Sequence, residues 1–192
     1  KKNNVKKIIM VGNITRPSIK DIKFDLNTLK LIKNFALDSS GDDKLLSTIS
    51  FFFKNKGFPT FDWKKICKDL FADKDNLTNV KPSKLALLNK DKGLFFFRKI
   101  GKADIAQSLI IQNKIILGIE ASEGTDELIK RCFGYKKIGD RGVLVKLSKY
   151  SQNLNLDIPA IGLKTVQNLH KYNFEGAFLE KHKCLIIDKE KV

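Results

Sequence analysis

Three carboxylates stand close together in one short stretch of this basic chain. Glu120 follows an apolar run, residues 114–119, that predicts a strand, and Glu123 and Asp126 lie in the turn before an expected helix. Carboxylates crowded near a helix N-terminus can bind Mg²⁺ or act in acid–base catalysis. The structural alternative is that Thr125 caps the helix and the acidic residues complement its dipole. These residues alone leave both interpretations open.

The elements expected around the carboxylates are those of an α/β fold. Apolar residues at helical spacing after Asp126, ending before Gly134, predict a helix. Two apolar runs, residues 104–112 and 115–120, flank a two-residue polar break and predict a β-hairpin. Further helices are expected over residues 26–36, 41–56, 62–70 and 83–100 and around Val166, and further strands over residues 5–11, 58–61, 141–147, 177–179 and 184–187.

A polar, aperiodic stretch over residues 72–79 predicts a domain boundary. Pro82 follows it, and the helical pattern resumes only afterwards. We therefore expect an N-terminal domain over residues 1–72 and a C-terminal domain over residues 80–192.

The formal charge of +16 and the pI near 9.7 invite comparison with nucleic-acid-binding proteins. Only four of the 37 basic residues are Arg, the usual reader of bases and phosphates. The basic excess is also spread over both halves of the chain, with no basic tail. These features favour a solvated coat of lysines, with no nucleic-acid partner expected.

The three cysteines are odd in number and far apart, so they predict neither a disulfide framework nor a zinc site. A reducing compartment fits this usage. No apolar run approaches the length of a membrane span, and no signal peptide is visible.

Five motifs occur in an order and spacing that resemble one enzyme family. They cover residues 12–18, 104–108, 120–126, 142–146 and 157–162, the last followed by Thr165-Val166. Together they resemble the LpxI-type UDP-2,3-diacylglucosamine pyrophosphatase family of lipid A synthesis. The resemblance covers nearly the whole chain.

The resemblance implies a Mg²⁺-dependent hydrolase that splits the pyrophosphate of UDP-2,3-diacylglucosamine into UMP and 2,3-diacylglucosamine 1-phosphate. It also implies a Rossmann-like N-terminal domain and a C-terminal mixed α/β domain, with the lipid-linked UDP-sugar bound between them. Such an enzyme would work in the cytoplasm, at the inner face of the inner membrane, as a peripheral protein and a possible homodimer. Apolar grooves would hold the acyl chains, and the lysine coat would favour anionic headgroups. The Phe triplets at residues 51–53 and 95–97 would otherwise serve the core.

Two departures from the family pattern stand out. The family's glycine-rich N-terminal segment has no match here, so we expect a partial Rossmann-like domain over residues 1–72. The family's Gln-Asp pair before the Asp-Leu-Pro motif is Gln152-Asn153 in this chain.

The chemistry of a pyrophosphate sets the predicted roles, because its hydrolysis needs charge neutralisation and an oriented water. The predicted catalytic residues are Asp157, Glu123, Asp126 and Lys146. The predicted metal ligands are Asp157, Glu120 and Glu123. The predicted substrate-binding residues are Arg16, Gln107, Gly124, Thr125, Gln152 and Thr165.

Asp157 is the carboxylate whose position is most suggestive, because Pro159 stiffens the loop that presents it. Its alternative role is that of a turn former. Lys146 has the alternative role of a solvated strand lysine. If the enzymatic interpretation holds, Glu120, Glu123, Asp126, Lys146 and Asp157 should converge on one cleft. The rival interpretations are a basic nucleic-acid-binding protein and an inactive, truncated relative that only binds lipid or nucleotide.

Overall fold

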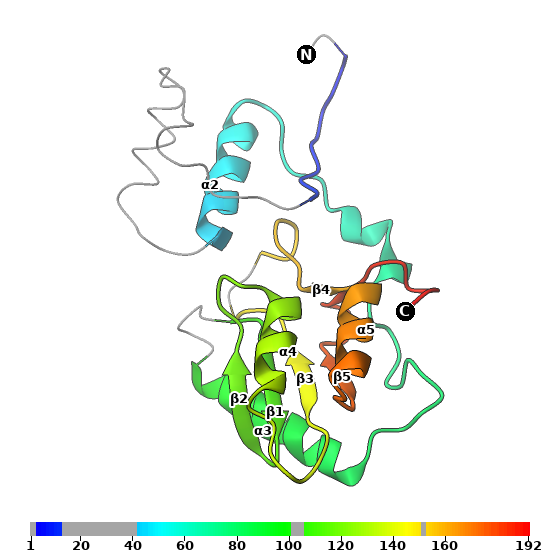
Figure 1. Cartoon of the computed structure of the whole chain (residues 1–192). Helices are drawn as coiled ribbons and strands as arrows, with labels where there is room; N and C mark the ends of the chain where they lie inside the picture. The colour runs from blue at the N-terminus through cyan, green and yellow to red at the C-terminus, as the bar shows by residue number, and fades with distance from the viewer. Residues whose placement is uncertain (1–2, 13–41, 101–105, 151–152) are drawn as a thin grey trace. The chain divides into compact units, whose positions relative to one another are not determined.

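The computed structural model describes residues 3–12, 42–100, 106–150 and 153–192 (Figure 1). They form two compact units. Unit 1 comprises the described residues within 1–66 and 153–157, and unit 2 those within 67–152 and 158–192. The division into domains at residues 72–80 stays a prediction.

A four-stranded mixed sheet organises unit 2. Its strands are β1 (Ser108–Gln112), β2 (Ile115–Ile119), β3 (Val143–Lys146) and β5 (Gly176–Leu179), in the order β2-β1-β3-β5. β1 pairs antiparallel with both β2 and β3, whereas β3 and β5 are parallel. With the helices described below, this sheet confirms the predicted α/β class.

The predicted hairpin is confirmed as β1 and β2. Its two turn residues, Asn113 and Lys114, have φ angles of 52° and 61°. A two-residue hairpin turn with both central residues in the left-handed region matches the right-handed twist of the strands. The turn sets Gln112 opposite Ile115, and a one-residue register shift between Ile110 and Ile111 then brings Glu120 beside Ser108, whose carbonyl accepts a hydrogen bond from the Glu120 amide at 3.0 Å.

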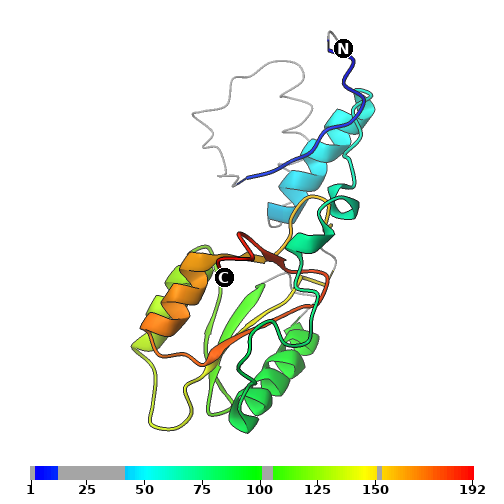
Figure 2. The same cartoon turned by 90° about the vertical axis from the view of Figure 1, so that its right-hand side faces the viewer.

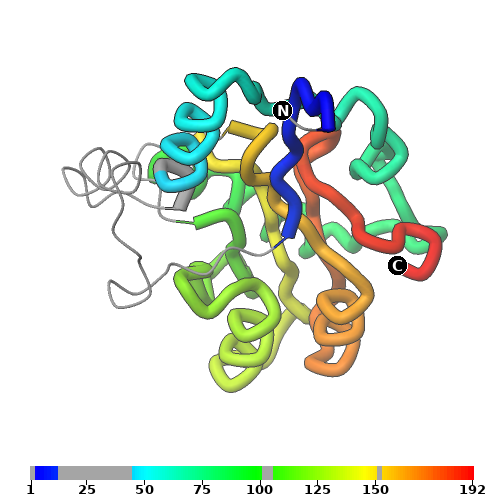
Figure 3. Tube along the Cα trace, turned by 90° about the horizontal axis from the view of Figure 1, so that it is seen from above, coloured from blue at the N-terminus to red at the C-terminus, as the bar shows by residue number. Residues whose placement is uncertain are grey.

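Three helices cover the two faces of this sheet, as Figure 2 shows. Helix α3 (Lys84–Ile100) lies on one face, and α4 (Thr125–Phe133) and α5 (Leu163–Lys171) lie on the other. Figure 3 shows α4 and α5 side by side. The layers follow from the sequence, because each strand is apolar on both faces.

The two sheet faces build two separate cores. Alternate strand residues such as Leu109 and Ile111 pack toward α3, while Ile110 and Leu144 pack toward α4 and α5. Burying each such side chain contributes about 1.5–3 kcal/mol. Gly93 allows the close approach of α3, since a Cβ there would lie 2.6 Å from Cδ1 of Ile111.

A smaller parallel pair, β4 (Ala160–Ile161) and β6 (Leu185–Ile186), completes unit 2. It packs with Ala72, whose amide donates to the Cys184 carbonyl at 2.9 Å. β4 was not expected from the sequence, and β6 is shorter than the predicted strand.

In unit 1, helix α2 (Asp42–Asn55) confirms the helix predicted over residues 41–56. The strand predicted over residues 5–11 is wrong, because among the described residues Ile8 forms only an isolated bridge with Thr60. That same bridge replaces the strand predicted at 58–61. The helix predicted over 62–70 is two short 3₁₀ turns, Trp63–Lys65 in unit 1 and Lys68–Leu70 in unit 2. The helix predicted over 26–36 lies outside the described residues, and the Rossmann-like character of this unit stays a prediction.

None of the helices within the described ranges combines the length and the apolar character needed to cross a bilayer.

Candidate active site

Lys146 is the buried centre of the candidate site. It is the last residue of β3, and its side chain lies on the α4 and α5 face with only 3% of the residue exposed. Its ammonium donates to Oγ1 of Thr125 at 2.7 Å and to Oγ of Ser108 at 3.0 Å. It also lies 3.6 Å from Oε2 of Glu120. Lys146 is therefore a paired core lysine and not the solvated strand lysine of the alternative interpretation.

Glu120 is the counter-ion of this lysine. Its Oε1 accepts a hydrogen bond from Oγ1 of Thr125 at 2.7 Å. Its Oε2 is buried and has no hydrogen-bond partner among the described residues, where the nearby ammonium of Lys146 compensates its charge. The Thr125 hydroxyl thus accepts from the lysine and donates to the carboxylate, and links the two charged groups.

A glycine makes this bridge possible. Gly124, and not Thr125 as predicted, is the N-cap of α4, with φ 79° and ψ 169°. Only glycine adopts such a conformation without strain. Thr125 becomes the first helical residue, and its hydroxyl is directed to Glu120 and Lys146 instead of to the amides of its own helix.

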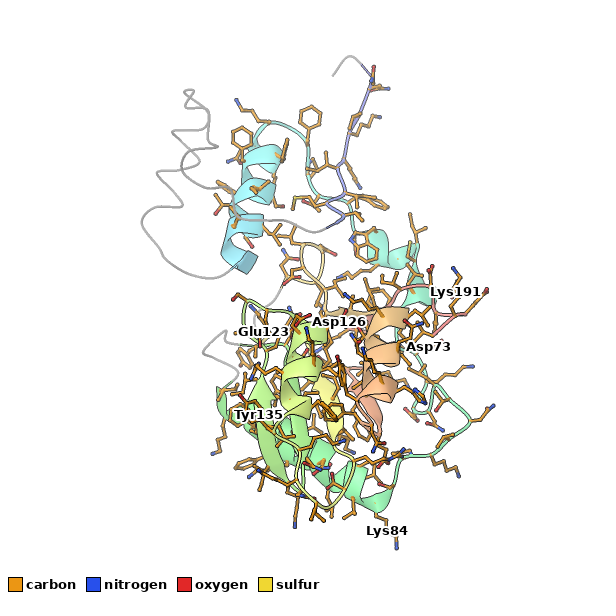
Figure 4. All side chains as sticks on the ribbon, viewed as in Figure 1. Asp73, Lys84, Glu123, Asp126, Tyr135 and Lys191 are labelled. Atoms are coloured by element: carbon orange, nitrogen blue, oxygen red, sulfur yellow. The ribbon has the colours of Figure 1, made fainter. Side chains whose placement is uncertain are left out.

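The adjacent residue ties α4 to α5. Oδ1 of Asp126 accepts a hydrogen bond from the buried Thr165 hydroxyl at 2.9 Å. Oδ2 of Asp126 lies 3.6 Å from the exposed ammonium of Lys164. Figure 4 shows Glu123 and Asp126 together near the N-terminal end of α4.

Glu123 is fixed by an arginine from the last turn of α4. Its carboxylate accepts hydrogen bonds from Nη2 of Arg131 at 2.5 Å and from the Ala121 amide at 3.0 Å. The bond from Arg131 is the main reason that the pKa of Glu123 lies below its ordinary value. Arg131 also donates to the Ile119 carbonyl at 3.0 Å, so the acidic turn is anchored to the end of β2.

The thiol of Cys184, which senses the charge of Lys146, stays neutral. Burial raises the pKa of Cys184 to about 12, although the positive charge of Lys146 opposes that shift. Cys184 therefore supplies no counter-charge to the lysine, and Glu120 does.

The structure brings some of the predicted site residues together and leaves others apart or undescribed. Glu120, Thr125 and Lys146 are directly bonded, and Asp126 and Thr165 form a neighbouring pair. The carbonyl of Gln107 accepts from the Leu147 amide at 2.9 Å, one position beyond the Ser108–Lys146 pair. Arg16 and Gln152 lie outside the described residues.

Asp157 belongs to unit 1. Its amide donates to the Asn153 carbonyl at 3.1 Å, within a turn in which the side-chain oxygen of Asn153 accepts from the Asn155 amide at 3.0 Å. The convergence of Asp157 with the carboxylates of unit 2 stays a prediction.

Two residues of the cluster, Ser108 and Arg131, were not among the predicted site residues. Ser108 closes the motif at residues 104–108, and its position immediately before the apolar core of β1 was the available signal. Arg131 lies on α4, eight residues after Glu123, which is about two helical turns further along the chain. Nothing in the local sequence indicates that pairing.

The carboxylates of the described residues do not by themselves form a metal cage. No group of three or more His, Cys, Asp or Glu side chains in the described parts of the chain could hold a metal ion. Mg²⁺, however, is usually held by one or two carboxylates together with waters and substrate phosphates. The donor set fits a metal of that shared kind and does not fit a resident, protein-only site.

A cavity of about 380 Å³ lies at the C-terminal end of α3. Its apolar lining includes Leu94, Phe97 and Leu147, and its polar lining includes Arg98 and Glu180. Burial acts to raise the pKa of Glu180, but hydrogen bonds from Lys183 and Ser148 outweigh it and lower the pKa. The cavity thus has an apolar wall with charged groups beside it.

Comparison with known proteins identifies relatives over most of the chain. The LpxI N-terminal domain matches residues 1–70, and the LpxI C-terminal domain matches residues 73–192. A protein of Caulobacter vibrioides named UDP-2,3-diacylglucosamine pyrophosphatase LpxI is 28% identical over 192 residues. That alignment covers 96% of this chain and 69% of the relative.

Proposed function

Because the chain belongs to the LpxI family, we propose that it hydrolyses the pyrophosphate bond of UDP-2,3-diacylglucosamine in lipid A biosynthesis. The products would be UMP and 2,3-diacylglucosamine 1-phosphate. The observation that carries this proposal is the match of both family domains, in order, to the whole length of the chain.

The reaction defines what the site has to do. A water oxygen forms a bond to one phosphorus, the bond from that phosphorus to the bridging oxygen breaks, and the water loses a proton. The proton needs a base, and the growing charge on the phosphates needs cations. Asp157, Glu123 and Asp126 are the proposed acid–base and water-orienting carboxylates, and Lys146 is proposed to supply fixed positive charge at the end of β3.

The geometry supports a more specific role for Lys146. With 3% of its surface exposed and two hydroxyls bound, its ammonium holds Thr125 and Glu120 in one arrangement. A fixed, water-excluded cation stabilises developing negative charge without reorganising during the reaction. Gly124 and Thr165, which we propose as substrate-binding residues, lie in the turn before α4 and on α5.

We include Mg²⁺ in the proposal, with Asp157, Glu120 and Glu123 as its proposed protein donors. When bound, the ion would neutralise phosphate oxygens and lower the pKa of a bound water. Glu120 and Glu123 each have a cationic partner, so metal binding would require one of these pairs to be exchanged.

The proposed place of action is the cytoplasmic surface of the inner membrane, where the two acyl chains of the substrate reside. The cavity at the end of α3 offers an apolar wall for such a chain. Homodimer formation is a separate proposal, which light scattering of the purified chain would test.

The decisive experiment measures UMP release from UDP-2,3-diacylglucosamine by the purified chain, with Mg²⁺ and with excess EDTA. We expect release that depends on the metal. Binding of the substrate without UMP release would instead identify an inactive relative. Salt-dependent binding of random duplex together with no UMP release would favour a nucleic-acid-binding protein.

A further inference from the structure

The outward face of α3 exposes apolar side chains that the core does not use. Leu85, Leu88 and Phe95 are 52%, 46% and 54% exposed. Their spacings of three and seven residues place them along one side of the helix. Monomeric proteins seldom expose so many large apolar groups in one stripe unless it contacts something else.

The opposite side of the helix is fully committed to unit 2. Ala86, Asn89 and Gly93 are buried against the sheet. Asn89 is also held from two directions, because its amide nitrogen donates to Asp140 at 3.0 Å and its oxygen accepts from the Lys114 amide at 2.7 Å. α3 therefore cannot rotate to bury its outward stripe.

Basic side chains surround the exposed stripe. α3 contains Lys84, Lys90, Lys92, Arg98 and Lys99 against a single acidic residue, Asp91. The ammoniums of Lys92 and Lys99 each lie 5.7 Å from the ring centroid of Phe95. Asp91 is paired with Lys90 at 3.3 Å, which leaves the outward face strongly positive. Lys84 points away from the protein at the start of the helix (Figure 4).

We propose that this face, formed by Lys84, Leu85, Leu88, Lys92, Phe95 and Lys99 and called here the α3 face, docks on an anionic lipid bilayer. Apolar groups enter the headgroup region while lysines pair with lipid phosphates, which is the pattern of an interfacial helix. A bilayer fits better than nucleic acid because lysines around apolar groups bind lipid phosphates without needing base contacts. The inference rests on the proposed function, since it is the lipid-linked substrate that gives the chain a reason to approach a membrane.

Cosedimentation with vesicles tests the α3 face directly. The probes are vesicles of phosphatidylcholine alone and of phosphatidylcholine mixed with phosphatidylglycerol. We expect the parent chain to bind the mixed vesicles, and salt to release it. The variant Lys84→Gln/Lys92→Gln/Lys99→Gln should bind about a hundredfold more weakly, at about fivefold for each lysine. The variant Phe95→Ser should bind several-fold more weakly while the parent charge is kept.

Matched controls separate the α3 face from the general lysine coat. Lys130→Gln/Lys171→Gln/Lys191→Gln removes the same charge from other exposed positions of unit 2, and Tyr135→Ser removes an exposed aromatic ring elsewhere. Both should bind mixed vesicles within about twofold of the parent. Equal loss in the control and α3 variants, equal binding by the parent to both vesicle types, or retained binding by both α3 variants would each overturn the inference.

Hydrolysis distinguishes failure of the docking surface from failure of the proposed function. On a short-chain, freely dissolved UDP-diacylglucosamine, the α3 variants should release UMP at the parent rate. On the long-chain substrate embedded in mixed vesicles, their rate should fall with their binding. If the parent chain releases no UMP from either substrate but binds vesicles through the α3 face, the proposed function fails and the docking surface stands. If the parent hydrolyses both substrates and the α3 variants match it on vesicles, the docking surface fails alone.

Discussion

Replacing Lys146 with methionine tests the buried ionic cluster most directly. Methionine is unbranched and only one heavy atom shorter, but it lacks the ammonium that lies 3.6 Å from Oε2 of Glu120. At that distance, and with an effective dielectric constant of about 20, the lost attraction is about 4–5 kcal/mol. Loss of one partner from a buried ion pair typically costs about 3–5 kcal/mol, because the other charge stays buried and unpaired. We therefore expect Lys146→Met to lower the free energy of unfolding of unit 2 by about 3–5 kcal/mol.

A second substitution, at Glu120, tests whether the loss of stability comes from the broken ion pair. Glu120→Gln in the Lys146→Met background removes the stranded charge and should recover most of the lost stability. The double-mutant cycle should give a coupling energy of at least about 3 kcal/mol between the two positions, because it contains the recovered stability and the cost of Glu120→Gln alone. Ser108→Ala is a useful companion, since it removes one acceptor of Lys146 but leaves the ion pair, and it should cost about 1–2 kcal/mol.

The unfolding of unit 2 has to be followed by the right probe. The single tryptophan, Trp63, lies in unit 1, so its fluorescence does not report on the sheet of unit 2. Hydrogen exchange of the β1 and β3 amides in native conditions reports on it directly. A Lys146→Met variant within 1 kcal/mol of the parent, or effects at Lys146 and Glu120 that simply add, would show that the Lys146–Glu120 pair does not stabilise unit 2.

Three further predictions address other parts of the chain. Asp157→Ala should reduce single-turnover UMP release by about 10²–10⁴-fold with substrate affinity retained, as loss of general-base help does; a variant that melts lower but cleaves at the parent rate would identify Asp157 as a turn former. Glu123→Gln should remove the part of the pH dependence of the free energy of unfolding that comes from the Arg131 pair. Because the folded-state pKa of Glu123 is lowered, the stabilisation by this pair is present above the ordinary value of 4.5 and is lost as pH falls through the folded-state pKa. Both partners are partly exposed, so urea titrations at pH 7 should show a loss of at most about 1 kcal/mol, and no such loss in strong acid. Gly118→Ala should destabilise unit 2 by about 1–3 kcal/mol in the same measurement, because the new Cβ would lie 2.5 Å from Sγ of Cys132 and 2.9 Å from Cδ1 of Leu128; a neutral effect would show that α4 can shift away from the sheet.

Local sequence rules worked where the structure depends on local interactions. The β1–β2 hairpin was predictable because Asn113 and Lys114 form a polar break between two apolar runs. With both residues at positive φ, they form a two-residue turn that joins the antiparallel strands. The start of helix α3 was predicted to within one residue, because the helical pattern resumes locally after Pro82. The strand predicted at residues 5–11 failed because an apolar run becomes a strand only with a partner, and within the part of the chain that the structure describes Ile8 pairs at one position alone.

The sequence predicted many residues of the candidate site, but not the hydrogen bonds and ion pairs that connect them. Glu120 and Thr125 are five positions apart, so their meeting at a strand-to-helix turn is a local event. Lys146 reaches them across the sheet, from 21 positions beyond Thr125, and its burial depends on the order β2-β1-β3. Periodicity alone could not distinguish a solvated lysine from a buried one, because both occupy the end of an apolar strand.

The charge balance of the site bears on the proposed metal. Each of its carboxylates in unit 2 has a cation within 4 Å: Lys146 beside Glu120, Arg131 beside Glu123 and Lys164 beside Asp126. The three pairs sum to zero: Lys146 supplies a local positive charge, but the cluster as a whole has no net positive charge to offset a pyrophosphate, which carries at least two negative charges near neutral pH. The missing charge has to arrive with the substrate or from residues beyond these pairs. We therefore expect Mg²⁺ to bind the chain weakly alone and at least tenfold more tightly when UDP-2,3-diacylglucosamine is present, because substrate phosphates complete its oxygen ligands. Isothermal titration of Mg²⁺ into the parent chain, with and without a non-hydrolysable substrate analogue in which a methylene group replaces the bridging oxygen, measures that difference without turnover, and equal affinities would show that the metal and the substrate bind independently.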